Sequence, residues 1–274
     1  MSLRTLILLA VTASLAAGIG AWLLRRPAAD RDWNADQARL PRVRVDGHVV
    51  HVQNVRDFRY RTEFDFDEHW EDRSYDLDRL SSIGFVLVPL SERWRGPAHS
   101  FVTFGFDDSS FVSISIEARR TRGERYSPLR GLWRRYELIY VVGDERDVIG
   151  RRAIHDGNPV YLFPIRATKD AMRALFVEML TRADALREHP AFYNTLTDNC
   201  TSLLLRHVEH AAPRRVQGGV AAVLPGYADE VAVKLDLIEG VRSAEEARRR
   251  YRINDKARAA EHAPDFSFRI RAAD

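Results

Sequence analysis

Cysteine is almost absent from this sequence: of its 274 residues, only Cys200 carries a thiol. An internal disulfide is therefore excluded, and a domain exported to an oxidising compartment must be held together by its core alone. The supply of apolar residues is sufficient for such a core, because hydrophobic residues make up 45% of the chain. The sequence is that of a globular protein whose one free thiol needs an explanation.

Lysine is also scarce, with only Lys169, Lys234 and Lys256 in the whole chain. The net charge of +3 therefore comes from arginines, which are interspersed with nearly as many acidic residues. A nucleic-acid-binding surface would need that charge to gather in a patch interleaved with aromatic residues, and no such cluster occurs. We expect no nucleic acid among the partners.

Charged residues are missing from residues 5–24, which contain only Thr, Ser and Gly besides apolar residues. A helix over this stretch would be roughly 30 Å long, enough to cross the core of a bilayer. We interpret residues 1–26 as a signal anchor that forms a transmembrane helix. A cleaved signal peptide is the alternative, because Ser14-Leu15-Ala16 is an imperfect version of the small-residue cleavage pattern.

The rest of the chain divides by composition into a polar tether (residues 27–42), a main domain (43–212) and a C-terminal appendage (213–274) that ends in a solvated helix and a loose tail. In the main domain, Asp46-Gly47 predicts a hairpin. Apolar runs predict further strands at 83–90, 99–106, 111–120, 134–142 and 159–165.

Two helices follow these strands. Thr168 can cap a helix whose apolar residues from Met172 to Ala183 have helical spacing, and a second helix starts after Asn199. A strand-rich middle followed by two helices predicts an α+β fold, with an antiparallel sheet and helices packed on one face.

Cys200 follows Asn199, a preferred N-cap residue, and so occupies the first position of the second helix. The helix dipole and the unpaired N–H groups at this end favour a thiolate, and the same groups can hold a developing oxyanion, with Asn199 as support. Three interpretations remain open for Cys200: a nucleophile, an inert buried thiol, and a partner in an intermolecular disulfide.

A cysteine nucleophile needs a base, and His99 at the start of a strand is the candidate. A five-residue loop after this strand would pair Gly105 with Phe111 and His99 with Glu117. His99 and Glu117 then lie on a mixed face of the sheet, which we expect to be covered by the helix that carries Cys200. The alternatives are a satisfied core histidine and a surface ion pair of Glu117.

Two charged stretches have plainer interpretations. The acidic residues between Asp65 and Asp72 predict a solvated loop, and we expect no metal site there and no cofactor elsewhere. The arginines between Arg119 and Arg125 either form salt bridges with that acidic stretch or meet lipid phosphates near the anchor.

The segments "AHSFVTFGF", "SISIEARR" and "YNTLTDNCT" resemble the Lnb N-terminal periplasmic domain family, and the resemblance covers roughly residues 55 to 210. It implies a circularly permuted papain-like (NlpC-type) fold and a relation to lipoprotein N-acyltransferases. By that similarity Cys200 would accept an acyl chain as a thioester, with His99 as the base.

The resemblance also implies partners and a location. The acyl donor would be a phospholipid or a lipoprotein, the acceptor a lipoprotein amine, and the chain a single-pass protein of the inner membrane with its soluble domain in the periplasm. A cysteine amidase or peptidase of the cell envelope and a non-catalytic envelope module are the alternatives, because the same thiol–imidazole pair also serves hydrolysis.

Overall fold

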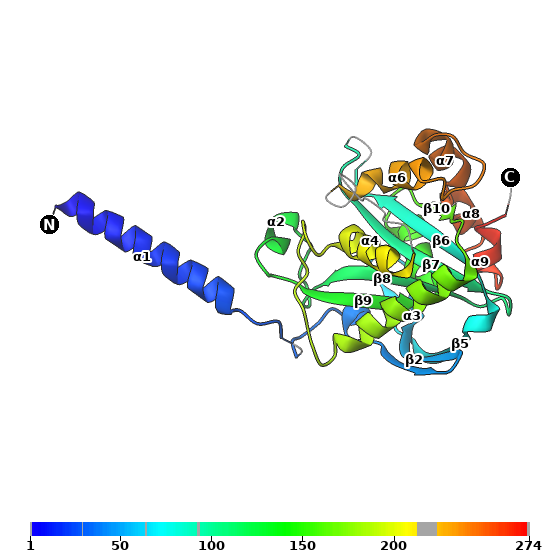
Figure 1. Cartoon of the computed structure of the whole chain (residues 1–274), viewed down its shortest axis with the longest axis horizontal. Helices are drawn as coiled ribbons and strands as arrows, with labels where there is room; N and C mark the ends of the chain where they lie inside the picture. Colours follow the sequence, from blue (N-terminus) through cyan, green and yellow to red (C-terminus); the bar gives the residue numbers. More distant parts are fainter. Residues whose placement is uncertain (1, 29, 64, 92–93, 213–223, 273–274) are drawn as a thin grey trace.

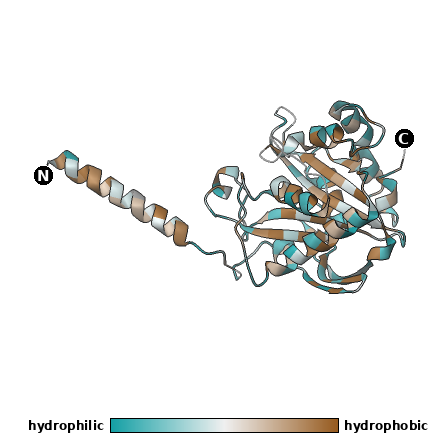
Figure 2. Cartoon of the chain, viewed as in Figure 1, coloured by the Kyte–Doolittle hydropathy of each residue, from teal (hydrophilic) through white to brown (hydrophobic). Residues whose placement is uncertain are grey.

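The computed structural model describes residues 2–28, 30–63, 65–91, 94–212 and 224–272 (Figure 1). Helix α1 (Leu3–Leu24) projects from the domain and is mostly apolar along its length (Figure 2). In these described ranges it is the one helix long and apolar enough to cross a membrane, a test that a signal sequence also passes. The predicted N-terminal apolar helix is therefore confirmed.

The domain is built around one sheet with the strand order β1-β2-β9-β8-β7-β6-β10, to which β5 adds by pairing with β2. Neighbouring strands are antiparallel except for β2 and β9, which meet in parallel at Arg56 and Gly143. The strands are β1 (Arg42–Asp46), β2 (Val49–Arg56), β5 (Trp70–Asp76), β6 (Leu80–Pro89), β7 (Ala98–Phe106), β8 (Phe111–Arg119), β9 (Glu137–Gly143) and β10 (Tyr161–Pro164). A separate ribbon consists of β3 (Arg59–Tyr60) and β4 (Phe66–Asp67).

The helices follow the strands or connect them. The α-helices after α1 are α2 (Pro128–Gly131), α3 (Lys169–Ala185), α4 (Cys200–Ala211), α6 (Ala228–Lys234), α7 (Ala244–Tyr251), α8 (Asn254–Ala259) and α9 (Phe266–Arg269). Short 3₁₀ turns form η1 (Ala35–Gln37), η2 (Leu77–Arg79) and η4 (Pro225–Tyr227), and a π-helix forms η3 (Arg146–His155). Thr168 caps α3 as predicted, since its side chain accepts a hydrogen bond from the Ala171 N–H.

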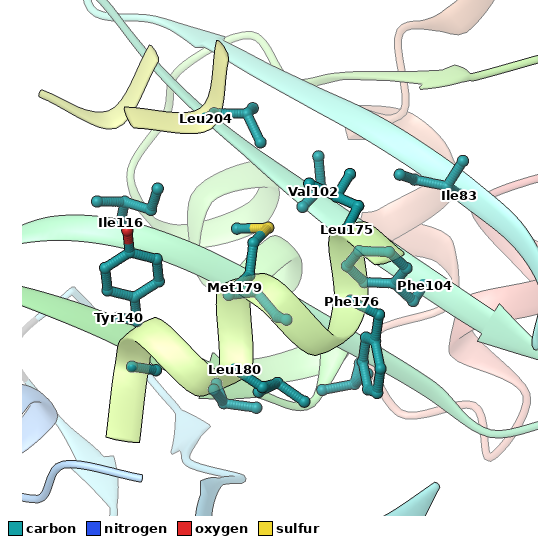
Figure 3. Close-up of a cluster of buried hydrophobic side chains, with 14 of the residues drawn as sticks. Ile83, Val102, Phe104, Ile116, Tyr140, Leu175, Phe176, Met179, Leu180 and Leu204 are labelled. Carbon is teal, nitrogen blue, oxygen red and sulfur yellow. The ribbon is translucent and has the colours of Figure 1, made fainter. Parts of the chain in front are cut away.

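The larger core lies between the sheet and helices α3 and α4 (Figure 3). Phe104 on β7 packs edge-on against Phe176 on α3, with ring centroids 5.0 Å apart. Met179 on α3 and Leu204 on α4 close the same cluster. The apolar face that the sequence assigns to β7 and β8 therefore supports the two longest helices of the domain.

A second core lies on the opposite face of the sheet, where Phe101 and Val141 meet Val148 of η3, Ala257 of α8 and Ile270. Helices therefore cover both faces, and the prediction of helices on one face is wrong. The α+β class itself is confirmed. The sequence pattern did not reveal η3 because this helix is rich in charged residues, several of which are buried against partners.

The two segments expected to be loose are packed. Trp33 and Gln37 in the predicted tether are 7% and 1% exposed, and Ala257 in the predicted solvated tail is fully buried. The acidic stretch is also not a plain loop, since it contains β4 and the start of β5. The predicted boundary between residues 212 and 213 adjoins a segment outside the described residues, so the domain division stays a prediction.

The β7–β8 hairpin has the predicted register, because Gly105 pairs with Phe111 and Val102 with Ile114. The pairing then stops. In the part of the chain that the structure describes, no backbone pairs join residues 98–101 of β7 to residues 115–119 of β8, although β7 continues to pair with β6 and β8 with β9. The two strands part at the end where His99 and Glu117 lie.

We predict that Phe176→Ala lowers the free energy of unfolding by about 3–5 kcal/mol, because the ring is fully buried among other aromatic rings. Phe268→Ala is the matched control, since it removes the same ring from a residue that is 49% exposed and should cost about 1 kcal/mol or less. Urea unfolding of the full chain in detergent micelles measures both. Equal losses of unfolding free energy in the two variants would contradict the assignment of Phe176 to the core.

Candidate active site at the start of α4

Helix α4 begins at Cys200, as predicted, and its first turn is closed by a capping box. The Asn199 side-chain oxygen accepts hydrogen bonds of 2.9 Å from the N–H groups of Thr201 and Ser202, and the Ser202 hydroxyl accepts one from the Asn199 N–H. These bonds satisfy backbone groups that a helix start leaves unpaired. The cap fixes the position of the thiol relative to the sheet.

Cys200 lies against β7, and the residue is 4% exposed. The neighbours of its sulfur are the Thr201 hydroxyl, 3.8 Å away, and Ser100, whose hydroxyl is 2.7 Å from that of Thr201. Burial raises the pKa of the thiol, and hydrogen bonds from Ser100 and Thr201 oppose this only in part. The expectation of a thiolate is therefore wrong for this arrangement: Cys200 is a protonated thiol at neutral pH.

His99 lies one residue earlier on β7 and belongs to a chain of polar contacts on β8. Its Nε2 is 2.7 Å from the Ser115 hydroxyl, which is 2.8 Å from a Glu117 carboxylate oxygen. Because the carboxylate can only accept, Ser115 donates its single proton to Glu117 and accepts from His99. We infer that His99 carries its proton on Nε2, which leaves the Nδ1 lone pair to act as a base.

Glu117 is held by residues from three parts of the chain. Arg152 of η3 and Gln37 of η1 donate to its two oxygens at 2.6 Å and 2.9 Å, in addition to Ser115. Burial alone would raise the pKa of this carboxyl, but the charge of Arg152 leads the opposing contributions and the net pKa is lowered. Glu117 is therefore ionised at neutral pH.

The same surroundings keep the His99 ring neutral. Burial, followed by the charge of Arg152, lowers the pKa of His99 to about 3, although Glu117 acts in the opposite direction. Its side chain is 18% exposed, so the ring is not sealed off from solvent. The imidazole is therefore unprotonated at physiological pH and available as a base, but a pKa of about 3 makes it a weak base in this arrangement.

The structure does not place His99 beside Cys200. The His99 ring contacts Phe101, which belongs to the second core, whereas Ser100 contacts Thr201 on the α3–α4 side. Consecutive strand residues point to opposite faces, and in the described residues no hydrogen bond joins the imidazole to the sulfur. The expectation that the Cys200 helix covers the mixed face is wrong, because the amphipathic α4 packs on the apolar face, where it buries more apolar surface.

Several residues of this site were missed by sequence reasoning. Ser115 shares a strand face with Glu117, so the alternation of β8 could have revealed it. Gln37 and Arg152 lie in segments that gave no signal, one interpreted as a tether and the other as part of a connection between strands. Tyr193, whose pKa is raised by burial and by Cys200, lies near the thiol and belongs to the "YNTLTDNCT" segment.

The other charged groups occupy separate places. His207 and His210 on α4 both contact Glu178 of α3, at 3.1 Å and 2.7 Å from one of its oxygens. In the described residues, the group with suitable spacing for a metal ion is His48, Asp76 and Asp78, outside the acidic stretch examined in the sequence. Neither group includes a residue of the Cys200 region.

Fold and site together define a class: a mixed α+β domain behind an apolar N-terminal helix, with one buried thiol at a capped helix start. The chain belongs to the Lnb N-terminal periplasmic domain family, whose model matches residues 66–227, more than half of the chain. The match extends from β4 to η4 and so includes β7, β8 and the start of α4. Among curated proteins and solved structures, none matches this chain.

The family supports a periplasmic domain, and together with α1 it is consistent with a single-pass membrane protein. It leaves the chemistry of Cys200, His99, Glu117 and Asn199 as a prediction.

We predict that the His99 ring stays neutral and protonated on Nε2 from pH 7 down to pH 5, since its pKa is about 3. Long-range proton–nitrogen NMR of the imidazole measures the tautomer, with His99→Gln identifying the signal. Ser115→Ala removes the acceptor of the Nε2 proton, so the signal should shift toward a mixture of tautomers. A doubly protonated ring at pH 6 would contradict the assignment.

We also predict that Cys200 is alkylated by iodoacetamide more slowly than a free cysteine at pH 7, and that the rate keeps rising above the pH at which ordinary cysteines ionise. The reason is that burial raises the pKa of the thiol, which lowers the thiolate fraction. Because Cys200 is the only cysteine, the same chain unfolded in urea serves as the control. A fast reaction that is independent of pH would indicate a preformed thiolate instead.

Proposed function

We propose that this chain is a membrane-anchored thiol acyltransferase of the periplasm, related to lipoprotein N-acyltransferases, with Cys200 as the nucleophile. The observation that supports this most directly is the buried, capped Cys200 thiol beside β7, whose neutral His99 ring is linked through Ser115 to the ionised Glu117 of β8. The relation to permuted papain-like folds, which the resemblance implies, is part of the same proposal.

In the proposed reaction the Cys200 sulfur attacks the carbonyl carbon of a fatty-acyl ester while its proton passes to Nδ1 of His99. The tetrahedral intermediate expels the alcohol, which takes that proton, and a thioester remains on Cys200. An amine then attacks the thioester, gives up a proton and releases the thiol. Support of the oxyanion by the start of α4 in both steps would require the N–H groups of Thr201 and Ser202 to exchange the Asn199 side chain for the substrate oxygen.

This mechanism requires the His99 ring to turn toward the sulfur. The parting of β7 and β8 supports such a movement, because a local turn of β7 at residues 98–101 would break no ladder to β8, although the ladder to β6 would have to yield. Ser115 and Glu117 would act as positioning residues, holding the proton on Nε2 until the ring accepts a second one.

A groove on the α4 side of the sheet, which Cys200 itself does not line, supports an acyl substrate. It has a volume of about 820 Å³ and runs between α3 and α4 over Tyr140 and Leu203. Leu203 follows Cys200 by three residues and so lies on the same side of α4. Ala174, Val177 and Ala185 of α3 contribute an apolar wall that suits an alkyl chain, alongside charged residues of α3 and α4.

The second candidate is a non-catalytic envelope module. The observation that favours it is the absence, in the described residues, of a hydrogen bond between His99 and Cys200. A cysteine hydrolase is the third outcome, in which water replaces the amine after the thioester has formed.

Intact-mass analysis of the full chain purified from native membranes distinguishes these functions. We expect a fatty-acyl mass on Cys200 that hydroxylamine removes, no such mass in Cys200→Ser, and formation at least about 100-fold slower in His99→Ala. His262→Ala is the matched control, because it removes an exposed histidine that does not line the groove and should leave the rate unchanged.

An unmodified thiol in the presence of phospholipid and lipoprotein donors would refute the acyltransferase and favour the non-catalytic module. Release of free fatty acid without transfer to an amine would favour the hydrolase.

A further inference from the structure

The end of α1 is attached to the loop that contains α2. Arg134 donates hydrogen bonds to the carbonyl oxygens of Trp22 and Leu23, at 3.4 Å and 3.2 Å, and its guanidinium lies 4.6 Å from the centre of the Trp22 ring. The neighbouring Trp133 meets Trp22 edge to face, with ring centroids 6.3 Å apart. Loop and helix end therefore lie at the same level along the axis of α1.

If α1 spans a bilayer, its end and the loop bonded to it lie at a defined depth relative to the membrane. The 22 residues of α1 give a length of about 33 Å, close to the thickness of the hydrocarbon core. Trp22 is the third residue from the end of the apolar run, before Arg25 and Arg26, and so lies at the membrane–water interface, where tryptophan is enriched. Trp133 and Arg134 must lie at that interface too.

Large apolar side chains are exposed on the same side of the domain. Leu129 is 72% exposed, Trp133 65%, Leu196 49% and Tyr126 36%. We call these four residues the apolar rim. Figure 1 shows α2 and the chain that leads into α4 on the side of the domain where α1 departs. A group of this size is unusual on a soluble surface unless it meets a partner or a membrane.

The rim is one surface although it comes from two loops. The Thr195 hydroxyl donates to the Pro128 carbonyl oxygen at 2.8 Å and lies 3.4 Å from the Tyr126 hydroxyl. Gly131 permits this close approach, because a Cβ at that position would lie 2.2 Å from the Thr195 hydroxyl oxygen. The loops carrying Leu129 and Leu196 are thus held against each other.

The second loop leads directly to the thiol. Asn194 caps its turn by accepting from the N–H groups of Leu196 and Thr197, and the Asn199 side chain donates to the Thr195 carbonyl oxygen at 2.9 Å. The residue that caps the Cys200 helix is therefore bonded to the loop that carries Leu196. A partner surface that binds the apolar rim would therefore also position the start of α4.

The charges around the rim favour an anionic surface. Arg25, Arg26 and Arg130 are exposed, whereas the nearby acids Glu124 and Glu137 are occupied by Arg135 and Arg31. Three of the four arginines in the run considered in the sequence are occupied elsewhere, while Arg125 is exposed. The other members, Arg119, Arg120 and Arg122, bind Gln37, Asp36 and Asp32 of the N-terminal segment, and not the acidic stretch.

We propose that the apolar rim inserts into the interfacial region of an anionic bilayer, so that the protein contacts the membrane through these loops as well as through α1. Leu129, Leu196 and Trp133 enter below the headgroups while the arginines remain among the phosphates. The domain then has one fixed orientation, with the start of α4 facing the lipid. The consequence for catalysis, delivery of an acyl chain to Cys200 from the bilayer, rests on the proposed function; the docking itself does not.

Docking is tested with the full chain in nanodiscs of phosphatidylethanolamine and phosphatidylglycerol. Cys200→Ser leaves no thiol, so Leu129→Cys, Val45→Cys or Leu23→Cys added to it can each be labelled with an environment-sensitive NBD group. We expect the Leu129 probe to emit at shorter wavelength and to be quenched by lipids carrying shallow spin labels. Val45, 46% exposed on the edge strand β1, is the matched control and should report water.

The Leu23 probe reports whether α1 is present and inserted. A Leu129 probe that stays in water while the Leu23 probe is quenched would overturn the proposal. Loss of the Leu23 probe from the purified protein would show that α1 has been cleaved. If the Leu129 probe of the cleaved protein then stays in water, the docking proposal is also overturned.

A second measurement separates docking from chemistry. With Cys200 intact, Leu129→Glu combined with Trp133→Glu should slow thioester formation from bilayer phospholipid about 10-fold or more, and leave the release of p-nitrophenol from p-nitrophenyl butyrate unchanged. Equal losses with both donors would mean that the rim acts through the structure of the site, which contradicts the proposal. If the wild-type chain reacts with neither donor, the proposed function fails while the probe result still decides the docking.

Discussion

The buried carboxylate of Glu117 is the constraint on which the site and its surroundings depend. A carboxylate removed from water is costly unless charged and hydrogen-bonding partners replace the solvent. Glu117 obtains them from η1, β8 and η3, through Gln37, Ser115 and Arg152. Three segments far apart in the sequence must therefore assemble around one side chain. Because the Ser115 hydroxyl donates its proton to Glu117, it can only accept from His99, and this sets the orientation of the His99 ring.

Gln37, which binds Glu117, also fixes the segment that connects the domain to α1. It is almost fully buried, its side-chain oxygen accepts from the Arg120 N–H, and its carbonyl oxygen accepts from Arg119. The segment between α1 and the domain is thereby fixed along β8, and further contacts join Ala28 and Arg31 to Glu137. A chain fastened in this way cannot act as a free tether, so the end of α1 has a defined place on the domain.

The two halves of the candidate site belong to different cores. Cys200 is surrounded by the α3–α4 core, and burial there keeps it a thiol; His99 faces η3, and the charge of Arg152 helps to keep it neutral. The two environments meet within one short stretch of β7 because His99 and Ser100 are consecutive and point to opposite faces of the sheet. A thiol and a base that are both neutral at rest avoid an ion pair in a dry site, and their meeting would then be a conformational step rather than a standing contact.

The sequence by itself determined the apolar helix α1, the register of β7 on β8, the Thr168 cap and the start of α4 at Cys200, because each is set by the period or cap of a short segment. It also carried enough of the "YNTLTDNCT" pattern to indicate the family. Tertiary structure alone decided which face of the sheet α4 covers, which residues hold Glu117, and that Cys200 remains protonated. Those outcomes depend on how much apolar surface each packing buries and on charges brought together from distant segments, and neither quantity is written in any local stretch of the chain.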